Sequence, residues 1–390
     1  MKLNNRHILR SLFTLPALLI VSVLTSCGNE PEPVVPAIDT DDITVSFRLL
    51  AGNAAATRAS EEYGTVEESY IDLNNLKILI FDKDQKLKQV LYDDGLMPPN
   101  TSLTPFGQGM YILKTKLDPQ LYSLTSEFAI VALANWRSLE SDTKLISDWK
   151  GHTLNAQEVG TLTISDLRDI TFTLNPIVEG DQPDSWMPGN GKWIPMFGSR
   201  YTSLKGYDAS KFNSDNPMPI PDVQLLRAFS KIEVENLDTG DNSPTIDNIT
   251  LSHRNIGGRL MQDFNFNGYT ANVVAPTIPA DVVHTERHIP FHKVGNRYSI
   301  YLPEMTLADA ASRQAICVNI DMNGVKHQKW IYLAPYNSNG EPVLQGPFDS
   351  DWDAVKRNYI YRYTINSLAF EFLVDVKPWI FGGKVHIPLE

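Results

Sequence analysis

The sequence predicts an all-β protein with two tandem β-sandwich domains. Short segments in which apolar and polar residues alternate recur along the chain at regular spacing, which is typical of half-buried strands in a sandwich. Two turn sequences, at residues 82–85 and 323–324, each separate a pair of such segments, as in β-hairpins. Helical periodicity is rare.

The size and charge of the chain limit the class of protein to which it can belong. Its 390 residues correspond to two or three domains, at about 100–200 residues per domain. The apolar fraction of 42% is sufficient for folded cores. A net charge of −12 argues against a nucleic-acid partner, because phosphates bind to basic patches. The two cysteines, Cys27 and Cys317, are too few for a disulfide framework.

Residues 1–26 have the three parts of a signal peptide, namely a basic start, an apolar middle and a small-residue end. Residues 24–27 resemble the lipobox of bacterial lipoproteins, which predicts lipid on the thiol of Cys27 and attachment to the outer membrane. The alternative is an ordinary signal peptide that contains a cysteine. Residues 27–42 are rich in proline and acidic side chains and are predicted to form an extended tether. After Cys27 no apolar run is long enough to span a bilayer.

Residues 43–220 are predicted to form the N-terminal sandwich. Ile43, Val45, Phe47 and Leu49 alternate with polar residues, which indicates a half-buried first strand. The other predicted strands cover residues 75–92 (a hairpin), 110–117, 127–135 and two short parts of 161–174. Residues 135–149 are the best local helix candidate. Residues 175–221 are rich in turn formers and are predicted to be a long ordered loop or an inter-domain connection.

Residues 221–390 are predicted to form the C-terminal sandwich. Its strands are expected within residues 223–236, 246–253, 259–262, 297–304, 314–333, 357–366, 370–379 and 384–390. The Asn323-Gly324 dipeptide is a favourable two-residue hairpin turn between residues 316–322 and 326–333.

The sequence lacks the motifs of an enzyme or of a cofactor site, including nucleotide-binding glycine loops and nucleophile elbows. His284, His288 and His292 have a metal-like spacing, but Pro290 argues against the helix that would bring them together, so no metal is predicted. Cys317 lies in an apolar strand and is expected to behave as a small hydrophobic residue.

Three tryptophans allow two interpretations. Trp149, Trp186 and Trp193 could form a platform on which a sugar stacks, or they could pin the long loop to a sandwich. The second interpretation is favoured, because nothing in the sequence places the three side chains together.

The order of several short motifs resembles that of the fimbrillins, the type V pilins of Bacteroidota. The motifs are the lipobox at Cys27 and residues 74–87, 194–198, 225–236, 301–304, 357–365 and 374–379. The resemblance implies two transthyretin-like β-sandwich domains and export to the cell surface as a lipoprotein. It also implies a structural subunit that polymerises with other pilin subunits into a pilus and supports adhesion to a host or bacterial surface.

The resemblance further implies proteolytic maturation. In this family an arginine-specific protease cuts the N-terminal domain, and the removal of the first strand leaves a groove that a neighbouring subunit fills. Arg58 lies among small and polar residues, the composition of an accessible cleavage site, so the expected cut separates Arg58 from Ala59. The alternative is that Arg58 is an ordinary solvated charge.

The donor strand is expected at the C-terminus. Val385, Ile387 and Leu389 alternate after Gly382 and Gly383, and they are the donor candidates. They could equally form the last strand of their own domain, and residues 370–376 are expected to do so. A ligand-binding or glycan-binding surface lipoprotein and an uncleaved pilus anchor remain alternative functions.

Overall fold

The computed structural model confirms an all-β fold with very little helix. The described residues are 43–51, 65–174, 186–261, 289–366 and 371–378, except for 108, 119–120, 124, 141, 143, 209–210, 238–239, 241–244, 253, 308–312, 323, 336, 338–340 and 345–353. None of the helices within these ranges has the length and apolar character that a membrane crossing requires.

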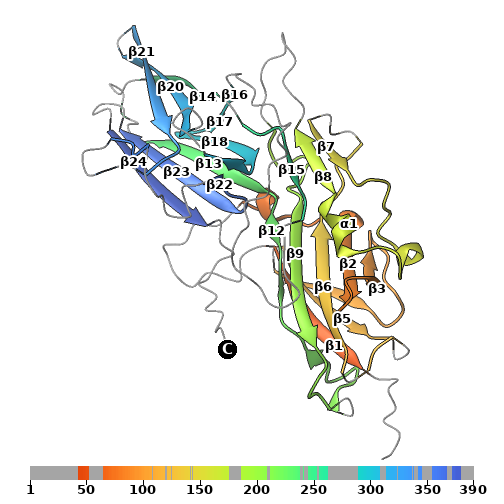
Figure 1. Ribbon diagram of the computed structural model, residues 1–390. Coiled ribbons are helices and arrows are strands. Elements are labelled where there is room, and N and C mark those ends of the chain that lie inside the picture. Colours follow the sequence, from red (N-terminus) through yellow and green to blue (C-terminus); the bar gives the residue numbers. More distant parts are fainter. Residues whose placement is uncertain are drawn as a thin grey trace, which may run out of the picture. The chain divides into compact units, whose positions relative to one another are not determined.

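Two five-stranded sheets formed by residues between 44 and 227 enclose a common core (Figure 1). The first has the order β10–β1–β5–β4, with β11 also paired to β1, and the second has the order β12–β9–β6–β2–β3. The strands of the first sheet are β1 (Thr44–Leu50), β4 (Ser102–Gly107), β5 (Met110–Lys116), β10 (Met218–Pro219) and β11 (Val223–Gln224). Those of the second are β2 (Leu76–Asp82), β3 (Leu87–Asp93), β6 (Glu127–Ala134), β9 (Met196–Ser203) and β12 (Leu226–Arg227).

The predicted strands at residues 43–50, 110–117 and 127–135 and the hairpin at 75–92 are confirmed by β1, β5, β6 and the β2–β3 pair. The prediction of a loop through residues 175–221 is wrong in part, because β9 and β10 lie within it. β9 pairs with β6 over eight residues. Gly198 is needed in this strand, because a Cβ atom there would lie 2.4 Å from the carbonyl oxygen of Gln224.

The other face of the second sheet is covered by residues 154–170, which include the α-helix α1 (Ile164–Arg168), as Figure 1 shows. A capping box between Thr163 and Asp166 starts this helix. The prediction of two short strands in residues 161–174 is therefore wrong for its first part, and only β8 (Thr171–Leu174) is a strand. A small sheet has the order β15–β8–β7, in which β15 is Gly257–Arg259 and β7 is Leu145–Asp148.

The prediction of a helix at residues 135–149 is wrong. Asn135 has a positive φ of 54°, which an α-helix does not allow. Its side-chain amide donates to the carbonyl oxygens of Tyr70 and Ile194, at 2.8 and 2.9 Å, so it joins two neighbouring segments. The end of the segment is a strand instead, in which Leu145 pairs with Leu174.

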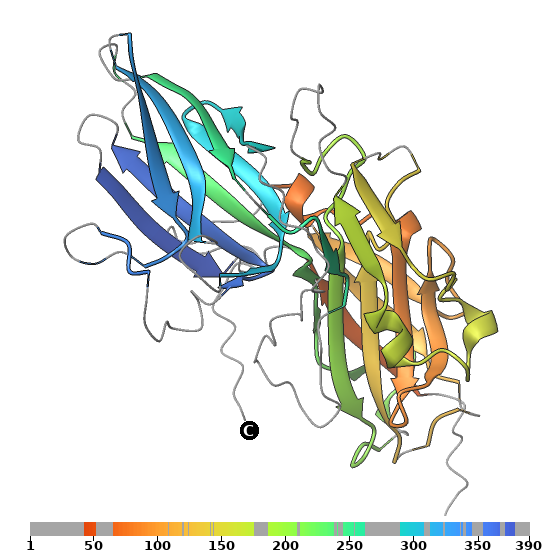
Figure 2. The ribbon, with the colours of Figure 1, turned by 45° about the horizontal axis from the view of Figure 1, so that its top comes forward.

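The second half of the chain contains two further sheets around a separate core (Figure 2). One has the order β17–β18–β13–β23–β24, and the other has the order β16–β14–β20–β21. The strands of the former are β13 (Phe229–Asn236), β17 (His292–Val294), β18 (Arg297–Pro303), β23 (Tyr359–Asn366) and β24 (Glu371–Pro378). Those of the latter are β14 (Thr245–Leu251), β16 (Ile289–Pro290), β20 (Gln314–Met322) and β21 (Val325–Tyr332).

The remaining described elements are short. They are the strand pair β19 (Met305–Thr306) and β22 (Ala354–Val355) and the 3-10 turns η2 (Glu67–Ser69), η3 (Leu73–Asn75) and η4 (Ala156–Glu158). The predicted hairpin at Gly324 is confirmed, because β20 and β21 pair antiparallel and Gly324 has a φ of +83°.

Candidate functional site

β1 is an interior strand with hydrogen-bonded neighbours along both edges. On one side all seven of its residues pair antiparallel with β5, from Thr44 opposite Lys116 to Leu50 opposite Met110. On the other side it pairs in parallel with β10 and β11. The amide of Ile220 also donates to the carbonyl oxygen of Ser46, at 2.9 Å. β1 is therefore the first described strand in the sequence, and it lies between other strands of its sheet and not at an edge.

The inward face of β1 is fully buried. Val45, Phe47 and Leu49 have relative exposures of 0%, 2% and 0%. We call the position that β1 occupies between β5 and the β10–β11 edge the β1 slot. Buried apolar residues of the same core cluster come from the slot's neighbouring strands and from the residues just beyond them, and they include Leu113, Leu117, Met218, Ile220, Val223 and Leu225.

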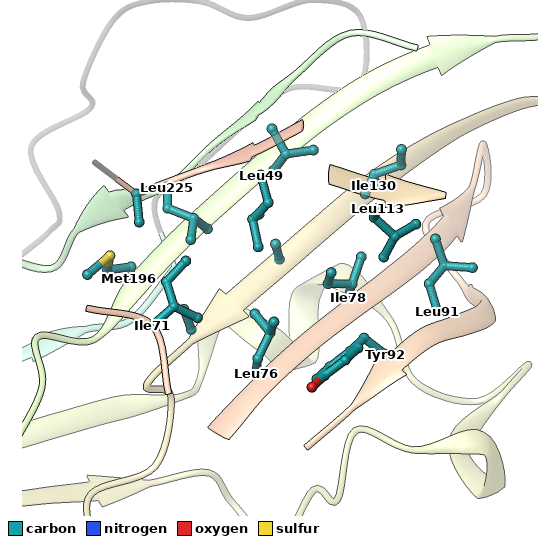
Figure 3. Close-up of a cluster of buried hydrophobic side chains, with 14 of the residues drawn as sticks. Leu49, Ile71, Leu76, Ile78, Leu91, Tyr92, Leu113, Ile130, Met196 and Leu225 are labelled. Atoms are coloured by element: carbon teal, nitrogen blue, oxygen red, sulfur yellow. The ribbon is translucent and has the colours of Figure 1, made fainter. Parts of the chain in front are cut away.

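Figure 3 shows Leu49 of β1 projecting into this core together with Leu225, Leu113 and side chains of the opposite sheet. Burial of one such apolar side chain contributes about 1.5–3 kcal/mol. The β1 slot thus requires an apolar side chain at every second position of its occupant.

The outward face of β1 carries one ion pair. Nε of Arg48 donates to Oδ1 of Asp222 at 2.9 Å, and Nη2 of Arg48 donates to Oδ2, so the contact is bidentate. This hydrogen bonding with Asp222 raises the pKa of Arg48. Both side chains are partly exposed, at 53% for Arg48 and 28% for Asp222. Asp222 lies between β10 and β11, at the edge of the β1 slot.

The end of β1 is held by a buried arginine. Nη2 of Arg227 donates to the carbonyl oxygen of Ala51 at 3.3 Å and to Oγ of Ser69 at 2.8 Å. Nε of the same side chain donates to the carbonyl oxygen of Glu68 at 2.8 Å, and Nη1 donates to Oδ1 of Asn358 at 3.2 Å. Arg227 therefore connects the strand that precedes residues 52–64, the turn that follows them, and the start of β23.

Glu68 lies at the centre of a buried group of charges. Nζ of Lys231 lies 2.8 Å from Oε1 of Glu68, and the hydroxyl of Tyr301 donates to the same oxygen. Nζ of Lys231 also lies 2.5 Å from Oε1 of Glu233, which in turn pairs with Arg362. The amide of Thr65 donates to Oε2 of Glu68 at 2.6 Å. η2 is thus fixed to β13 and β18 by charge-assisted hydrogen bonds.

Burial shifts several pKa values in this group. Desolvation lowers the pKa of Arg227 to about 10, although Glu68 and Tyr301 oppose the shift, so Arg227 is charged at neutral pH. Desolvation and Glu68 both raise the pKa of Tyr301 well above its ordinary value. Desolvation opposes the charge of Lys231, but Glu68 and Glu233 outweigh it and raise the pKa of Lys231. At neutral pH Arg227 and Lys231 are therefore charged and Tyr301 is protonated.

The sequence-predicted site residues lie outside the described part of the chain. They are Cys27, Arg58, Ala59, Val385, Ile387 and Leu389, together with residues 1–26 and the tether at 27–42. His284 and His288 also lie outside it, whereas His292 is in β17. Within the described ranges no three His, Cys, Asp or Glu side chains are grouped as metal ligands would be.

Each of the three tryptophans packs against another aromatic side chain. Trp186 is buried and stacks on Phe229 with 5.0 Å between ring centroids. Its indole Nε1 donates to Oδ2 of Asp142 at 3.1 Å. Trp193 packs on Tyr70, and Trp149 packs edge-on against Trp136. The prediction that these side chains pin segments to the core is confirmed for Trp186, which has no face free for a sugar.

Cys317 is buried in β20, as predicted, and burial raises the pKa of its thiol. The thiol form therefore dominates at neutral pH, and Cys317 acts as an apolar residue.

Glu68, Asp222 and Arg227 were not predicted from the sequence. Their partners lie far away along the chain, since Asp222 is separated from Arg48 by 174 residues and Arg227 from Ala51 by 176. The one available signal was the presence of Arg227 and Lys231 beside the apolar residues of a predicted strand region.

A scan of protein-family models finds no match to the chain, and neither does a search of curated protein sequences. Solved structures do match. The tip fimbrial protein Mfa3 from Porphyromonas gingivalis, with a C-terminal truncation, is 17% identical, with a TM-score of 0.49 over 86% of this chain and 98% of that one. A fimbrial assembly protein from Parabacteroides distasonis is 13% identical, with a TM-score of 0.41 over 86% of this chain and 99% of that one.

A putative cell adhesion protein from Parabacteroides distasonis is 14% identical, with a TM-score of 0.44 over 87% of this chain and 97% of that one. The chain is thus similar in structure, at low sequence identity, to fimbrial and cell-adhesion proteins of Bacteroidetes.

Proposed function

We propose that this chain is a structural subunit of a cell-surface type V pilus that supports adhesion. In this proposal it is exported as a lipoprotein with lipid on Cys27 and is cut between Arg58 and Ala59. Another pilin subunit then inserts a strand into the β1 slot. The observation that carries the proposal is the position of β1, an interior strand whose only chain connection to the rest of the described residues passes through residues 52–64.

The geometry of the β1 slot supports this proposal. Loss of β1 removes the pairing partner of β5 along seven residues and of β10 and β11 on the other edge. It also uncovers the apolar side chains that Val45, Phe47 and Leu49 contact in the core. A groove with free backbone hydrogen-bonding groups on both sides and apolar pockets at every second position accepts an extended strand.

Residues on both sides of the proposed cut support the same function. Ala51, before the segment, and Glu68 and Ser69, after it, are all held by Arg227. The segment itself is rich in small residues and contains Arg58 as its single basic residue. A cut there leaves the turn at Glu67–Ser69 fixed by Lys231 and Tyr301 while β1 loses its covalent connection.

The other parts of the proposal come from the sequence resemblance. They are two transthyretin-like β-sandwich domains, at residues 43–220 and 221–390, and a donor strand near the C-terminus that includes Val385, Ile387 and Leu389. The partners are other pilin subunits, the outer membrane before cleavage, and a receptor on a host or bacterial surface. No cofactor and no catalytic activity are part of the proposal.

The N-terminal sequence and intact mass of the protein sheared from its native cell surface test this function. We expect a chain that begins at Ala59 and carries no lipid. A chain that still begins at acylated Cys27 would contradict the proposed maturation and would favour an uncleaved pilus anchor or a ligand-binding lipoprotein. An Arg58→Ala variant is the matched control, because it should keep the lipidated N-terminus if Arg58 is the cleavage site.

A further inference from the structure

The apolar face of β1 leaves its register incompletely determined. A slip of one residue would turn every core-facing side chain of β1 toward solvent and is therefore excluded. A slip of two residues keeps Val45, Phe47 and Leu49 on the core face, because side chains alternate with a period of two. The β1 slot therefore needs a second feature to fix the position of its occupant along the groove.

The ion pair on the outward face of β1 fixes the position of the strand along the groove. Arg48 is the single basic residue of β1, and Asp222 contacts it with both carboxylate oxygens. Asp222 precedes Val223, which pairs with Leu49, so the carboxylate lies directly beside position 48 of the slot. The rise in a strand is about 3.3 Å per residue, so a slip of two residues in either direction moves the cation by about 6.6 Å and breaks the bidentate contact.

We infer that Asp222 selects the strand that another subunit inserts into the β1 slot, and its register, by pairing with a basic side chain at the position of Arg48. This inference rests on the proposed function. The partner is thus a strand with apolar residues at the positions of Val45, Phe47 and Leu49 and with arginine or lysine between the last two. The donor candidates of this chain have only His386 and Pro388 between them, so the partner is a different pilin subunit and not a second copy of this chain. Specificity of this kind is electrostatic and acts on the choice of partner more than on total affinity.

A peptide competition on the full-length chain tests the inference. A recognition sequence for a site-specific protease is inserted after Arg58, so that the experiment does not depend on the natural cut. The chain is cleaved in place and incubated in mild denaturant with two peptides of residues 43–51 that carry different labels. One has the native sequence, and the other carries Ser46→Arg with Arg48→Ser, which keeps its composition, net charge and apolar face.

We expect the native peptide to be incorporated about three- to fivefold in excess over the exchanged peptide, as measured by mass spectrometry of the complex. The size follows from the typical contribution of a partly exposed, bidentate ion pair. In an Asp222→Ala chain the excess should disappear. An Asp215→Ala chain, in which a different exposed acid before β10 is removed, should keep it.

The outcomes separate the inference from the proposed function. Equal incorporation of both peptides by the unaltered chain would overturn the role of Asp222 while leaving strand exchange in place. The same conclusion would follow if the excess persisted in Asp222→Ala. Failure of the cleaved chain to incorporate either peptide, under conditions in which β1 itself dissociates, would overturn the proposed function and with it the inference.

Discussion

Nη2 of Arg227 donates to the carbonyl oxygen of Ala51 at 3.3 Å, so a wholly buried cation lies at the end of β1. The same guanidinium contacts Glu68, Ser69 and Asn358. One guanidinium group therefore donates to three separate segments, at residue 51, residues 68–69 and residue 358. The effect of its loss on the free energy of unfolding can be measured.

Replacement of Arg227 by methionine should destabilise the protein by about 3 kcal/mol. The apolar side chain fills most of the volume but leaves the carbonyl oxygens of Ala51 and Glu68 without this donor, and unsatisfied buried groups are costly. Urea unfolding at pH 7 measures the effect. Arg137→Met is the control, because Arg137 is partly exposed in its pair with Asp94 and should cost less than about 1 kcal/mol. Equal losses in both variants would contradict the role of Arg227.

Truncation of Phe47 to alanine should reduce the free energy of unfolding by about 3–5 kcal/mol, because the ring is 2% exposed and lies in the shared core of two sheets. Ser46→Ala, one residue away on the outward face, should change it by less than about 0.5 kcal/mol. Thermal unfolding of the two variants gives the comparison. A small effect of Phe47→Ala would mean that β1 contributes little to the core.

The stability difference between the wild type and Tyr301→Phe should depend on pH. At pH 7–9 the wild type should be more stable by about 1–3 kcal/mol, since the Tyr301 hydroxyl donates to the carboxylate of Glu68. The folded-state pKa of Tyr301 is raised, so above about pH 10 the unfolded wild type ionises first and the wild type loses stability.

The difference should therefore shrink by up to about 1.4 kcal/mol per pH unit above pH 10. Urea unfolding of both proteins at pH 7 to 11 measures it. Because Lys231 and Arg227 are present in both proteins, their own titration cancels to first order. A difference that stays constant up to pH 11 would show that the folded-state pKa of Tyr301 is not raised.

Trp186→Phe should cost about 1–3 kcal/mol. The phenyl ring retains the stacking on Phe229, but Oδ2 of the buried Asp142 carboxylate loses its indole donor. The matched change Trp149→Phe should cost less, because Trp149 is only partly buried and makes an edge-on contact with Trp136. Chemical denaturation distinguishes the two, and a larger loss at Trp149 would contradict the assignment of Trp186 as the main anchor.

The sequence predicted those strands and hairpins that are determined by residues close together in the chain. The alternation around Phe47, the turn that follows Asp82 and the turn at Gly324 each specify a strand or hairpin within a few residues, and the structure has all three. β9 was missed because glycine and turn formers surround it, while its glycine, Gly198, is required by the close approach of Gln224. That requirement comes from a distant strand and has no local signal.

The candidate site was predictable in part. The first strand and its apolar face could be inferred, since its own sequence determines them. The residues that close and flank the β1 slot could not, because Arg227 and Asp222 resemble solvated charges until the fold places Ala51 and Arg48 beside them. Glu68 is a further example, since burial of an acid is explained by Lys231 and Tyr301 from remote strands.

The pairing of β1 also has a mechanical consequence. Its hydrogen-bonded neighbours run along its full length on one edge and along most of it on the other. A force along the strand axis therefore loads these hydrogen bonds in shear, so that many must fail together, whereas a strand peeled from one end loses them one after another. A strand in the β1 slot is therefore held in the geometry that best resists a pull along its own axis.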